Sequence, residues 1–297
     1  MSVQIFDLTH TFEPFMPQWP SGCNLKMEVK RFHANDGMYN IQWEGIMHRG
    51  THMDAPLHVT ECTPDITQYP LWRFFGSGVC LDIPKGKWGK ITPEDLENAE
   101  PQIRPGDIVM INTRQHHIWS DSDDYFAYGC GALGSTADWL IERNVKMVGY
   151  GCQANDHPMA TKLVDHGLGP TRPDLIEEWK QEYGRDPLID FPLWEDGHKN
   201  LMVKGGIPGV ENVGDDVGEG GDFDQIIGKR CFFAAFPWRF VNGEGSGVRV
   251  LAITDPERTF RFETGRKESA LSENTKVRLQ QKSKLNLVCS QKDMPHV

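Results

Sequence analysis

The sequence predicts an α/β fold, because short β-like runs alternate with helix-start signals along the chain. The chain has 297 residues, which is enough for one large domain or two small ones. Hydrophobic residues make up 38% and charged residues 25%, as in an ordinary soluble globular protein. The connections between the runs are too irregular for a regular barrel.

Five short runs rich in apolar residues are predicted as strands. They cover residues 79–83, 108–112, 146–149, 231–236 and 248–253. Helical signals alternate with some of them. Thr92 is a predicted N-cap with Pro93 at the first helical position. Ser135 is predicted to cap a helix over residues 136–143. That helix has one apolar face, formed by Ala137, Leu140 and Ile141.

The segments between these elements differ in composition. The first 30 residues are rich in Pro, Trp and Phe, which predicts an ordered loop. Residues 161–197 are polar and contain proline, and we expect an insertion with one short helix near 175–183. Residues 205–221 are a glycine-rich loop region. The predicted division is a domain at 1–265 and a polar, poorly ordered C-terminal tail or arm at 266–297.

The bulk properties exclude several classes of partner. The formal net charge is -11 and no block of Lys and Arg stands out, so a nucleic-acid partner is not expected. The N-terminus lacks the basic and apolar regions of a signal peptide, and no apolar run is long enough to cross a membrane. Seven scattered cysteines without a C-x-x-C pair favour reduced thiols and a cytoplasmic protein.

The most informative stretch lies at residues 48–58. His48, His52, Asp54 and His58 fall within eleven residues, and imidazole and carboxylate are the ligands that a borderline divalent cation takes at neutral pH. All four residues have even sequence numbers. Side chains alternate between the two faces of an extended segment, so such a segment would present these four on one face. Gly50 and Pro56 argue against a continuous helix or a central strand and favour a segment that bends around an ion. The alternative is a loop with unrelated histidines.

Two other motifs carry less weight. Residues 149–154 match G-x-G-x-x-A after a strand, but a dinucleotide site needs a helix there, and Pro158 disfavours one. No G-x-S-x-G motif is present. Cys152 at the end of a strand is a conceivable nucleophile, although a buried thiol is the more common role.

The pattern His-x-Gly-Thr-His-x-Asp-x-Pro-x-His resembles the signature of the putative cyclase family, which includes bacterial kynurenine formamidase and isatin hydrolase. Weaker similarities occur in the same order as in that family and together span about residues 5 to 255. They lie at residues 7–9, 16–20, 148–149, 156–158 and 245–253.

The resemblance implies a compact single domain with a mixed β-sheet and flanking helices, assembled as a homodimer or homotetramer. It implies that His48, His52 and Asp54 bind a metal and that His58 transfers protons. A second metal would be held by Asp54 with His198 and Glu211. The spacing from His198 to Glu211 is one residue longer than in the family, and we expect the extra residue within 205–209.

The resemblance further implies a divalent ion, zinc or manganese, with one or two per chain. The expected chemistry is metal-dependent hydrolysis, in which an activated water opens a small cyclic amide or lactone or cleaves a formamide. His58 or Glu211 would shuttle the proton. Trp19, Phe15 and Trp43 are the expected substrate wall. The long insertion departs from short formamidases, so kynurenine formamidase itself is not assigned. The alternative is a non-catalytic metal- or ligand-binding protein on the same fold.

Overall fold

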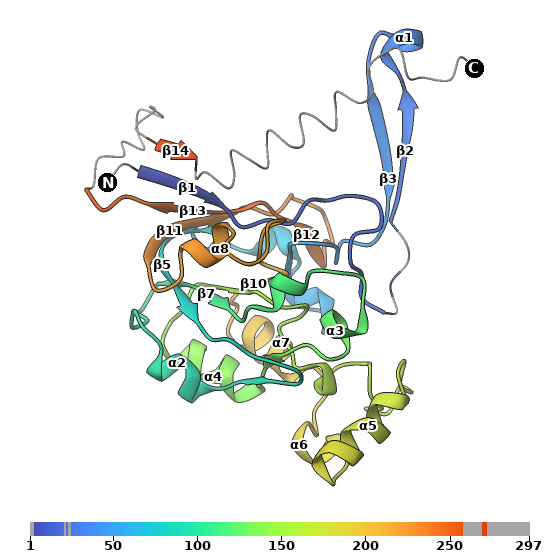
Figure 1. Cartoon of the computed structure of the whole chain (residues 1–297), viewed down its shortest axis with the longest axis vertical. Coiled ribbons are helices and arrows are strands. Elements are labelled where there is room, and N and C mark those ends of the chain that lie inside the picture. Colours follow the sequence, from blue (N-terminus) through green and yellow to red (C-terminus); the bar gives the residue numbers. More distant parts are fainter. Residues whose placement is uncertain (1–2, 21, 23–24, 258–268, 272–297) are drawn as a thin grey trace.

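The computed structural model describes residues 3–20, 22, 25–257 and 269–271. Ten strands form one sheet: β1 (Val3–Asp7), β4 (His52–Asp54), β5 (Phe75–Asp82), β7 (Ile108–Asn112), β9 (Met147–Tyr150), β10 (Gly209–Glu211), β11 (Arg230–Ala235), β12 (Gly245–Gly247), β13 (Val250–Thr254) and β14 (Ser269–Leu271). Their order in space is β12-β4-β10-β9-β7-β5-β11-β13-β1-β14 (Figure 1).

The sheet is mixed. Strands β5, β7, β9 and β10 are mutually parallel, whereas β4 and β12 on one side and β11 and β13 on the other are antiparallel to their neighbours. Strand β1 is antiparallel to β13 and parallel to β14. Parallel neighbours need crossover connections, and these carry α2 (Pro93–Asn98) between β5 and β7 and α4 (Gly134–Glu142) between β7 and β9. The predicted single α/β domain with a mixed sheet and flanking helices is confirmed.

The five predicted strands are all present; β7 has the predicted ends, and the other four strands are shifted. The largest shift is in β5, which begins at Phe75 rather than at residue 79. Its first residues include Gly76 and Gly78, which lack apolar side chains, and they join the strand because they pair with β11. Five short strands of this sheet, β1, β4, β10, β12 and β14, were missed. Strand β1 lies in the predicted N-terminal loop and β10 in the predicted glycine-rich loop, so both loop predictions are partly wrong.

The two predicted helix starts have different outcomes. The Thr92 hydroxyl accepts the Asp95 amide hydrogen bond and the Asp95 carboxylate accepts that of Thr92, a complete capping box. The predicted cap at Ser135 is wrong, because α4 begins at Gly134 and Ser135 already lies in its first turn. Its N-cap is Leu133, which makes no capping bond with its side chain.

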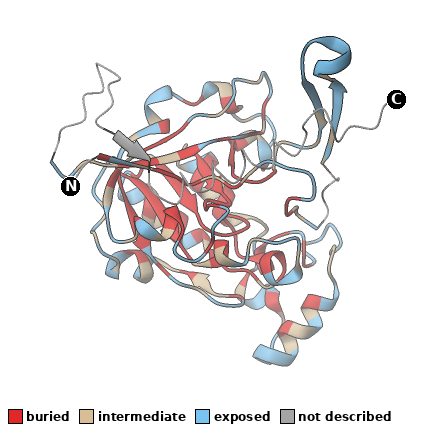
Figure 2. Ribbon diagram, turned by 45° about the horizontal axis from the view of Figure 1, so that its top comes forward, coloured by how far each residue is buried: buried red, intermediate tan, exposed pale blue. Residues whose placement is uncertain are grey.

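Apolar side chains form a core on each face of the sheet. One core contains Met53, Met110, Val210, Phe223 and Phe233. The other packs the sheet against α2 and α4 and contains Leu81, Leu96, Ile111, Leu140 and Val148. Figure 2 shows the buried residues concentrated in the sheet and the helices next to it.

The segment 161–197 folds against the domain with a small core of its own. The predicted helix is present as α5 (Asp174–Tyr183), and the short helices α6 (Pro187–Asp190) and α7 (Asp196–His198) follow it. Leu175 and Trp179 of α5 are buried with Phe191, Trp88 and Met159. The insertion therefore packs through large apolar side chains on Trp88, which comes from the body of the protein.

A hairpin projects from the body at its other side. Strands β2 (Lys26–Arg31) and β3 (Asn40–Glu44) pair only with each other among the described strands and are joined across α1 (His33–Asp36) (Figure 1). Almost all its residues are exposed, including Val29, Met38, Tyr39 and Ile41. We call residues 26–44 the arm. A lone two-stranded hairpin is marginally stable in water, so the arm needs further contacts to hold its shape.

The expectations for the C-terminal tail and for the cysteines concern some residues outside the described part of the chain. Within the predicted tail, 266–297, only β14 is described, and it pairs in parallel with β1 at the edge of the domain's sheet. No described helix has both the length and the apolar character needed to cross a lipid bilayer. The described free thiols are those of Cys62, Cys80, Cys130, Cys152 and Cys231.

His157 joins the insertion to the body and makes stability depend on pH. Its Nε2 donates to the Trp88 carbonyl (2.9 Å), its Nδ1 accepts from the Met159 amide (3.1 Å), and its ring stacks on Phe191. Burial lowers the pKa of His157 from 6.5 to about 4. Between these values the unfolded chain binds more protons than the folded chain, so stability falls as the pH falls.

We therefore expect the free energy of unfolding to drop between pH 6.5 and pH 4, with His157 accounting for at most about 3 kcal/mol. Urea unfolding at several pH values should show a smaller drop in His157→Gln than in wild type. His33→Gln, which changes an exposed histidine of the arm, should follow wild type. Equal pH slopes in His157→Gln and wild type would contradict this account.

Candidate metal centre

Strand β4 places the first two candidate ligands. His52 and Asp54 are two residues apart and share one face, whereas Met53 between them points into the apolar core. The strand lies between β10 and β12, so the expectation that this segment is not a central strand is wrong. Gly50 and Pro56 act just outside it. Gly50 turns the chain with a φ of 56°, and Pro56 begins the 3-10 helix Pro56–His58.

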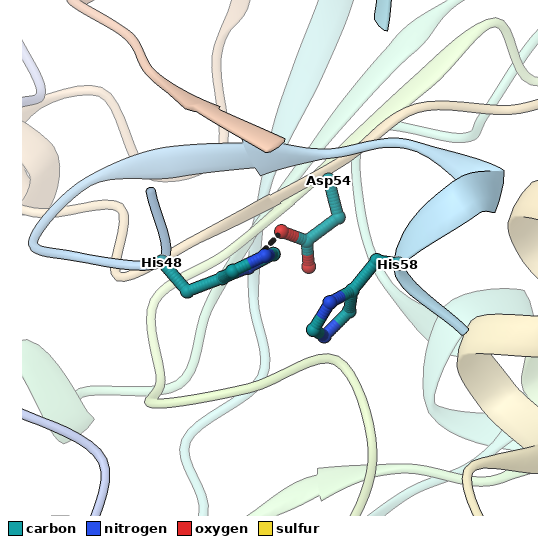
Figure 3. Close-up of side chains that lie close together, drawn as sticks. All are labelled: His48, Asp54 and His58. Carbon is teal, nitrogen blue, oxygen red and sulfur yellow. Dashed lines mark ion pairs between the residues drawn. The ribbon is translucent and has the colours of Figure 1, made fainter. Parts of the chain in front are cut away.

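Asp54 is the centre of the cluster. Its Oδ1 lies 2.8 Å from His48 Nδ1 and 3.3 Å from His52 Nε2. Its Oδ2 lies 3.4 Å from His198 Nε2. Figure 3 shows the His48 ring reaching this carboxylate, with the His58 ring close by. One buried carboxylate thus contacts three histidines through its two oxygens.

His198 and Glu211 complete the far side. Glu211 lies directly opposite His52 in the antiparallel pair of β10 and β4, and its Oε2 is 3.5 Å from His52 Nε2. Its Oε1 is 2.9 Å from His198 Nε2. The structure therefore brings all five predicted ligands together. The π-helix Lys199–Lys204 follows His198 directly. A π-turn holds one more residue than an α-turn. This helix, rather than the segment 205–209, can therefore accommodate the residue by which the His198-to-Glu211 spacing exceeds that of the family.

Asp156 is a site residue that the sequence analysis did not assign. Its Oδ2 lies 2.5 Å from His198 Nδ1 and accepts the His198 amide at 2.9 Å, and its Oδ1 accepts the Gly197 amide at 2.8 Å. These bonds orient the His198 ring with Nε2 toward Asp54 and Glu211. A carboxylate behind a ligating histidine is common in metal sites. The sequence did contain a signal for this residue, because Asp156 lies in the segment 156–158 that resembles the family.

Asn212 is a second unassigned residue. It has a left-handed φ of 54°, which asparagine tolerates better than most residues. Its Nδ2 donates to the Gly50 carbonyl at 3.1 Å, and its Oδ1 accepts from the Tyr125 hydroxyl at 2.7 Å. The Gly50 carbonyl also accepts from His52 Nδ1 at 2.9 Å, which leaves His52 Nε2 to face the cluster. Asn212 thus ties the turn before β4 to the end of β10.

The cluster strongly perturbs its own protonation. Burial favours neutral His52, but the carboxylates of Asp54 and Glu211 raise the pKa of His52 to about 9. Burial alone would raise the pKa of Asp54, yet His48 and His52 hold it well below its usual range. Burial opposes protonation of His198 as well, but Asp156 raises the pKa of His198 well above its ordinary value. Positive charge is therefore favoured between these carboxylates.

The residues fit a divalent cation. His48 Nε2 and His52 Nε2 are buried nitrogens without a hydrogen-bond partner, a costly arrangement that an ion would relieve. Two sets of three residues could each hold an ion, because the potential ligand atoms within a set lie within 4.8 Å of one another. One set is His52, Asp54 and Glu211, and the other is His48, Asp54 and His58. Imidazole and carboxylate donors suit zinc and manganese.

His58 is placed differently from the ligand histidines. It lies at the end of the 3-10 helix, is exposed at the rim of the cluster, and stacks on His48 with ring centroids 3.8 Å apart and planes 30° apart. Stacked rings direct their lone pairs side by side, which disfavours joint binding of one ion. Burial by the surrounding protein, and then repulsion from the neighbouring His48, lower the pKa of His58 to about 3, so its ring is neutral.

A cavity of about 260 Å³ opens onto the cluster. It is lined by His52, His58, His198 and Glu211 and by the apolar side chains of Trp19, Phe126 and Trp194. Glu195 also lines it, and burial raises the pKa of this carboxyl. Nothing in the local sequence marks Glu195 as a site residue.

The three predicted wall residues have different positions. Trp19 lines the cavity at the cluster and packs edge-on against Phe126. Trp43 lines a neighbouring apolar cavity of about 320 Å³, which shares Ile46 and Gly50 with the first. Phe15 is 95% exposed and lines neither of these cavities, so this chain does not place it at the site.

Known proteins resemble this chain in both sequence and structure. The model of a family described as putative cyclase matches residues 6–157. A kynurenine formamidase from Bordetella petrii is 34% identical over 167 residues, which cover 54% of this chain and 75% of that protein. A kynurenine formamidase from Bacillus mycoides is 21% identical over 249 residues, covering 84% and 96%.

Solved structures share the fold. Isatin hydrolase A from Ralstonia solanacearum superimposes with a TM-score of 0.65 at 22% identity, covering 85% of this chain and 92% of that one. A predicted metal-dependent hydrolase from Bacillus stearothermophilus gives 0.59 at 18% identity, covering 85% and 99%. The matched residues 6–157 contain His48 to His58 and Asp156, whereas His198 and Glu211 lie beyond them. The chain belongs to the putative cyclase family.

Proposed function

We propose that this protein is a metal-dependent hydrolase of amide, cyclic amide or lactone bonds. The observation that carries the proposal is a buried carboxylate, Asp54, shared by two sets of donors that open onto a cavity. His48 and His52 form one set with Asp54, and His198 and Glu211 form the other. Relatives named kynurenine formamidase and fold neighbours named isatin hydrolase support the same reaction class.

His48, His52, Asp54, His198 and Glu211 would hold one or two zinc or manganese ions. When bound, such an ion would polarise a carbonyl and lower the pKa of a water molecule. Asp156 and the Gly50 carbonyl hold the remaining ring nitrogens of His198 and His52, which fixes the direction of their free Nε2 atoms. The ligand side chains are therefore positioned before substrate enters.

His58 would carry the proton. Its ring faces the cavity beside the ligands, so it is placed to accept a proton from attacking water and donate it to the leaving nitrogen or oxygen. Glu211 was the other candidate. Its Oε1 accepts from the Asn155 amide at 2.6 Å and lies against His198, which suits a fixed ligand better than a mobile proton carrier.

The cavity suits a small, flat substrate. Trp19, Phe126 and Trp194 provide an aromatic wall beside the cluster, and a space of about 260 Å³ holds little more than one ring system. We therefore favour a small aromatic or cyclic amide or lactone. Trp43 would contact only a substrate that extended into the neighbouring cavity.

A panel of formanilides, lactams and lactones tests the proposal. Hydrolysis of at least one class should disappear with a chelator and return with zinc or manganese, because the five ligands have no other way to activate water. Elemental analysis of the same sample should find at least about one ion per chain. Metal bound at full occupancy without hydrolysis of any panel member would instead favour a non-catalytic binding protein on this fold.

We further infer that the chain self-associates and acts in the cytoplasm, with the arm as the contact between copies. The arm exposes Val29, Ile41, Met38 and Tyr39 and lacks a covering layer in the described chain, and the free thiols suit a reducing compartment. Sedimentation should give the mass of a dimer or tetramer. A monomer at micromolar concentration would contradict this inference.

A further inference from the structure

A second group of histidine and carboxylate side chains lies outside the centre described above. His116 and His117 belong to the 3-10 helix Gln115–Ile118, which follows β7. Asp224 belongs to α8 (Asp222–Gln225). One potential ligand atom from each lies within 4.8 Å of the others. None of the three residues is shared with the first centre, so the two groups can be separated by mutation.

The contacts in this group converge on the Asp224 carboxylate. His117 Nε2 is 2.7 Å from Asp224 Oδ2, and His116 Nε2 is 3.4 Å from Asp224 Oδ1. The two rings are 4.4 Å apart and inclined by 70°. Unlike the parallel rings of His48 and His58, inclined rings can direct their nitrogen lone pairs toward one point.

His116 supplies an independent observation. The residue is 1% exposed, and neither Nδ1 nor Nε2 has a hydrogen-bond partner. A buried imidazole without partners costs free energy that an ion at Nε2 would recover. The buried ring packs against Phe223, with ring centroids 5.1 Å apart. The open nitrogen therefore belongs to a fixed side chain next to a carboxylate.

The other charged neighbours set limits on the site. Arg114 Nη1 is 3.3 Å from Asp224 Oδ1, and the same guanidinium binds Asp82 at 2.8 Å. Asp224 also accepts from the Asn112 side chain at 3.1 Å and from the Gly220 amide at 2.9 Å. These donors fix the carboxylate, and Arg114 opposes a nearby cation. We expect weaker binding here than at the first centre, which has two carboxylates, Asp54 and Glu211.

We propose that His116, His117 and Asp224 form a second, structural site for a borderline divalent cation such as zinc. The ion would replace the proton between His117 and Asp224 and take the lone pair of His116. The ion would join the segment after β7, which carries His117, to α8, which carries Asp224. These two residues are 107 positions apart in the sequence. Binding to the folded chain alone raises its stability.

Zinc titration of the full chain tests this site. The first centre is removed by the double change His52→Ala with Asp54→Asn, because both donor sets share Asp54, and bound zinc is measured by equilibrium dialysis with elemental analysis. We expect about one zinc per chain and a rise in Tm of roughly 4 °C at a hundredfold excess over the dissociation constant. Adding His117→Gln, whose amide can still donate to Asp224, should remove both effects. Adding His33→Gln should remove neither.

His117→Gln alone, made in the wild-type protein, gives a second measurement that does not depend on the double variant. His117→Gln should lose one zinc per chain from the wild-type total while the protein stays folded by circular dichroism. His116→Gln should behave in the same way. The proposal is overturned if the double variant binds no zinc, or if His116→Gln and His117→Gln both retain the wild-type stoichiometry.

Discussion

Asp54→Asn is expected to remove the metal and the activity together. Asp54 contacts both donor sets, with Oδ1 toward His48 and His52 and Oδ2 toward His198. Asparagine keeps the shape but loses the charge, and its amide nitrogen cannot act as a ligand. We expect metal occupancy below about one tenth of wild type and a fall in kcat/KM of at least roughly 10³-fold. Elemental analysis and initial rates measure both.

Asp107→Asn is the matched control. Asp107 is also a buried aspartate with a charged partner, Arg230, but it lies at the start of β7, whereas the metal centre lies at the carboxyl ends of the parallel strands. This change should lower stability and leave the metal bound. If folded Asp54→Asn protein keeps full occupancy, the assignment of the centre is wrong.

His58→Ala is expected to keep the metal and lose the rate. The stacked ring of His58 is poorly directed for joint ligation with His48, and its neutral form faces the cavity. Loss of a general acid–base group costs roughly 10²–10⁴-fold in kcat. Added imidazole should restore part of this loss, because it can enter the space and carry the proton.

His33→Ala serves as the control for His58→Ala, since it removes an exposed histidine of the arm. It should change neither metal content nor rate. Loss of metal in His58→Ala would make His58 a ligand, as its place near His48 and Asp54 also allows. Unchanged rate and metal would make it a structural residue.

Local signals in the sequence determined much of the near half of the centre. His52 and Asp54 share a face because strand side chains alternate, and this holds wherever the strand lies in the sheet. The Thr92 capping box likewise depends on residues three apart. The compact mixed sheet was implied by the family resemblance, which rested mainly on the segment 48–58. These features need no contact between distant parts of the chain.

Only the tertiary structure decided the far half. Glu211 faces His52 because β10 pairs antiparallel with β4, and a register shift of one residue would turn Glu211 away. Asp156 reaches His198 across 42 positions, and His117 reaches Asp224 across 107. Single short strands such as β4 and β10 have little propensity of their own and exist because their neighbours bond to them. Long-range pairing, which carries no local pattern, therefore set which carboxylates meet which histidines.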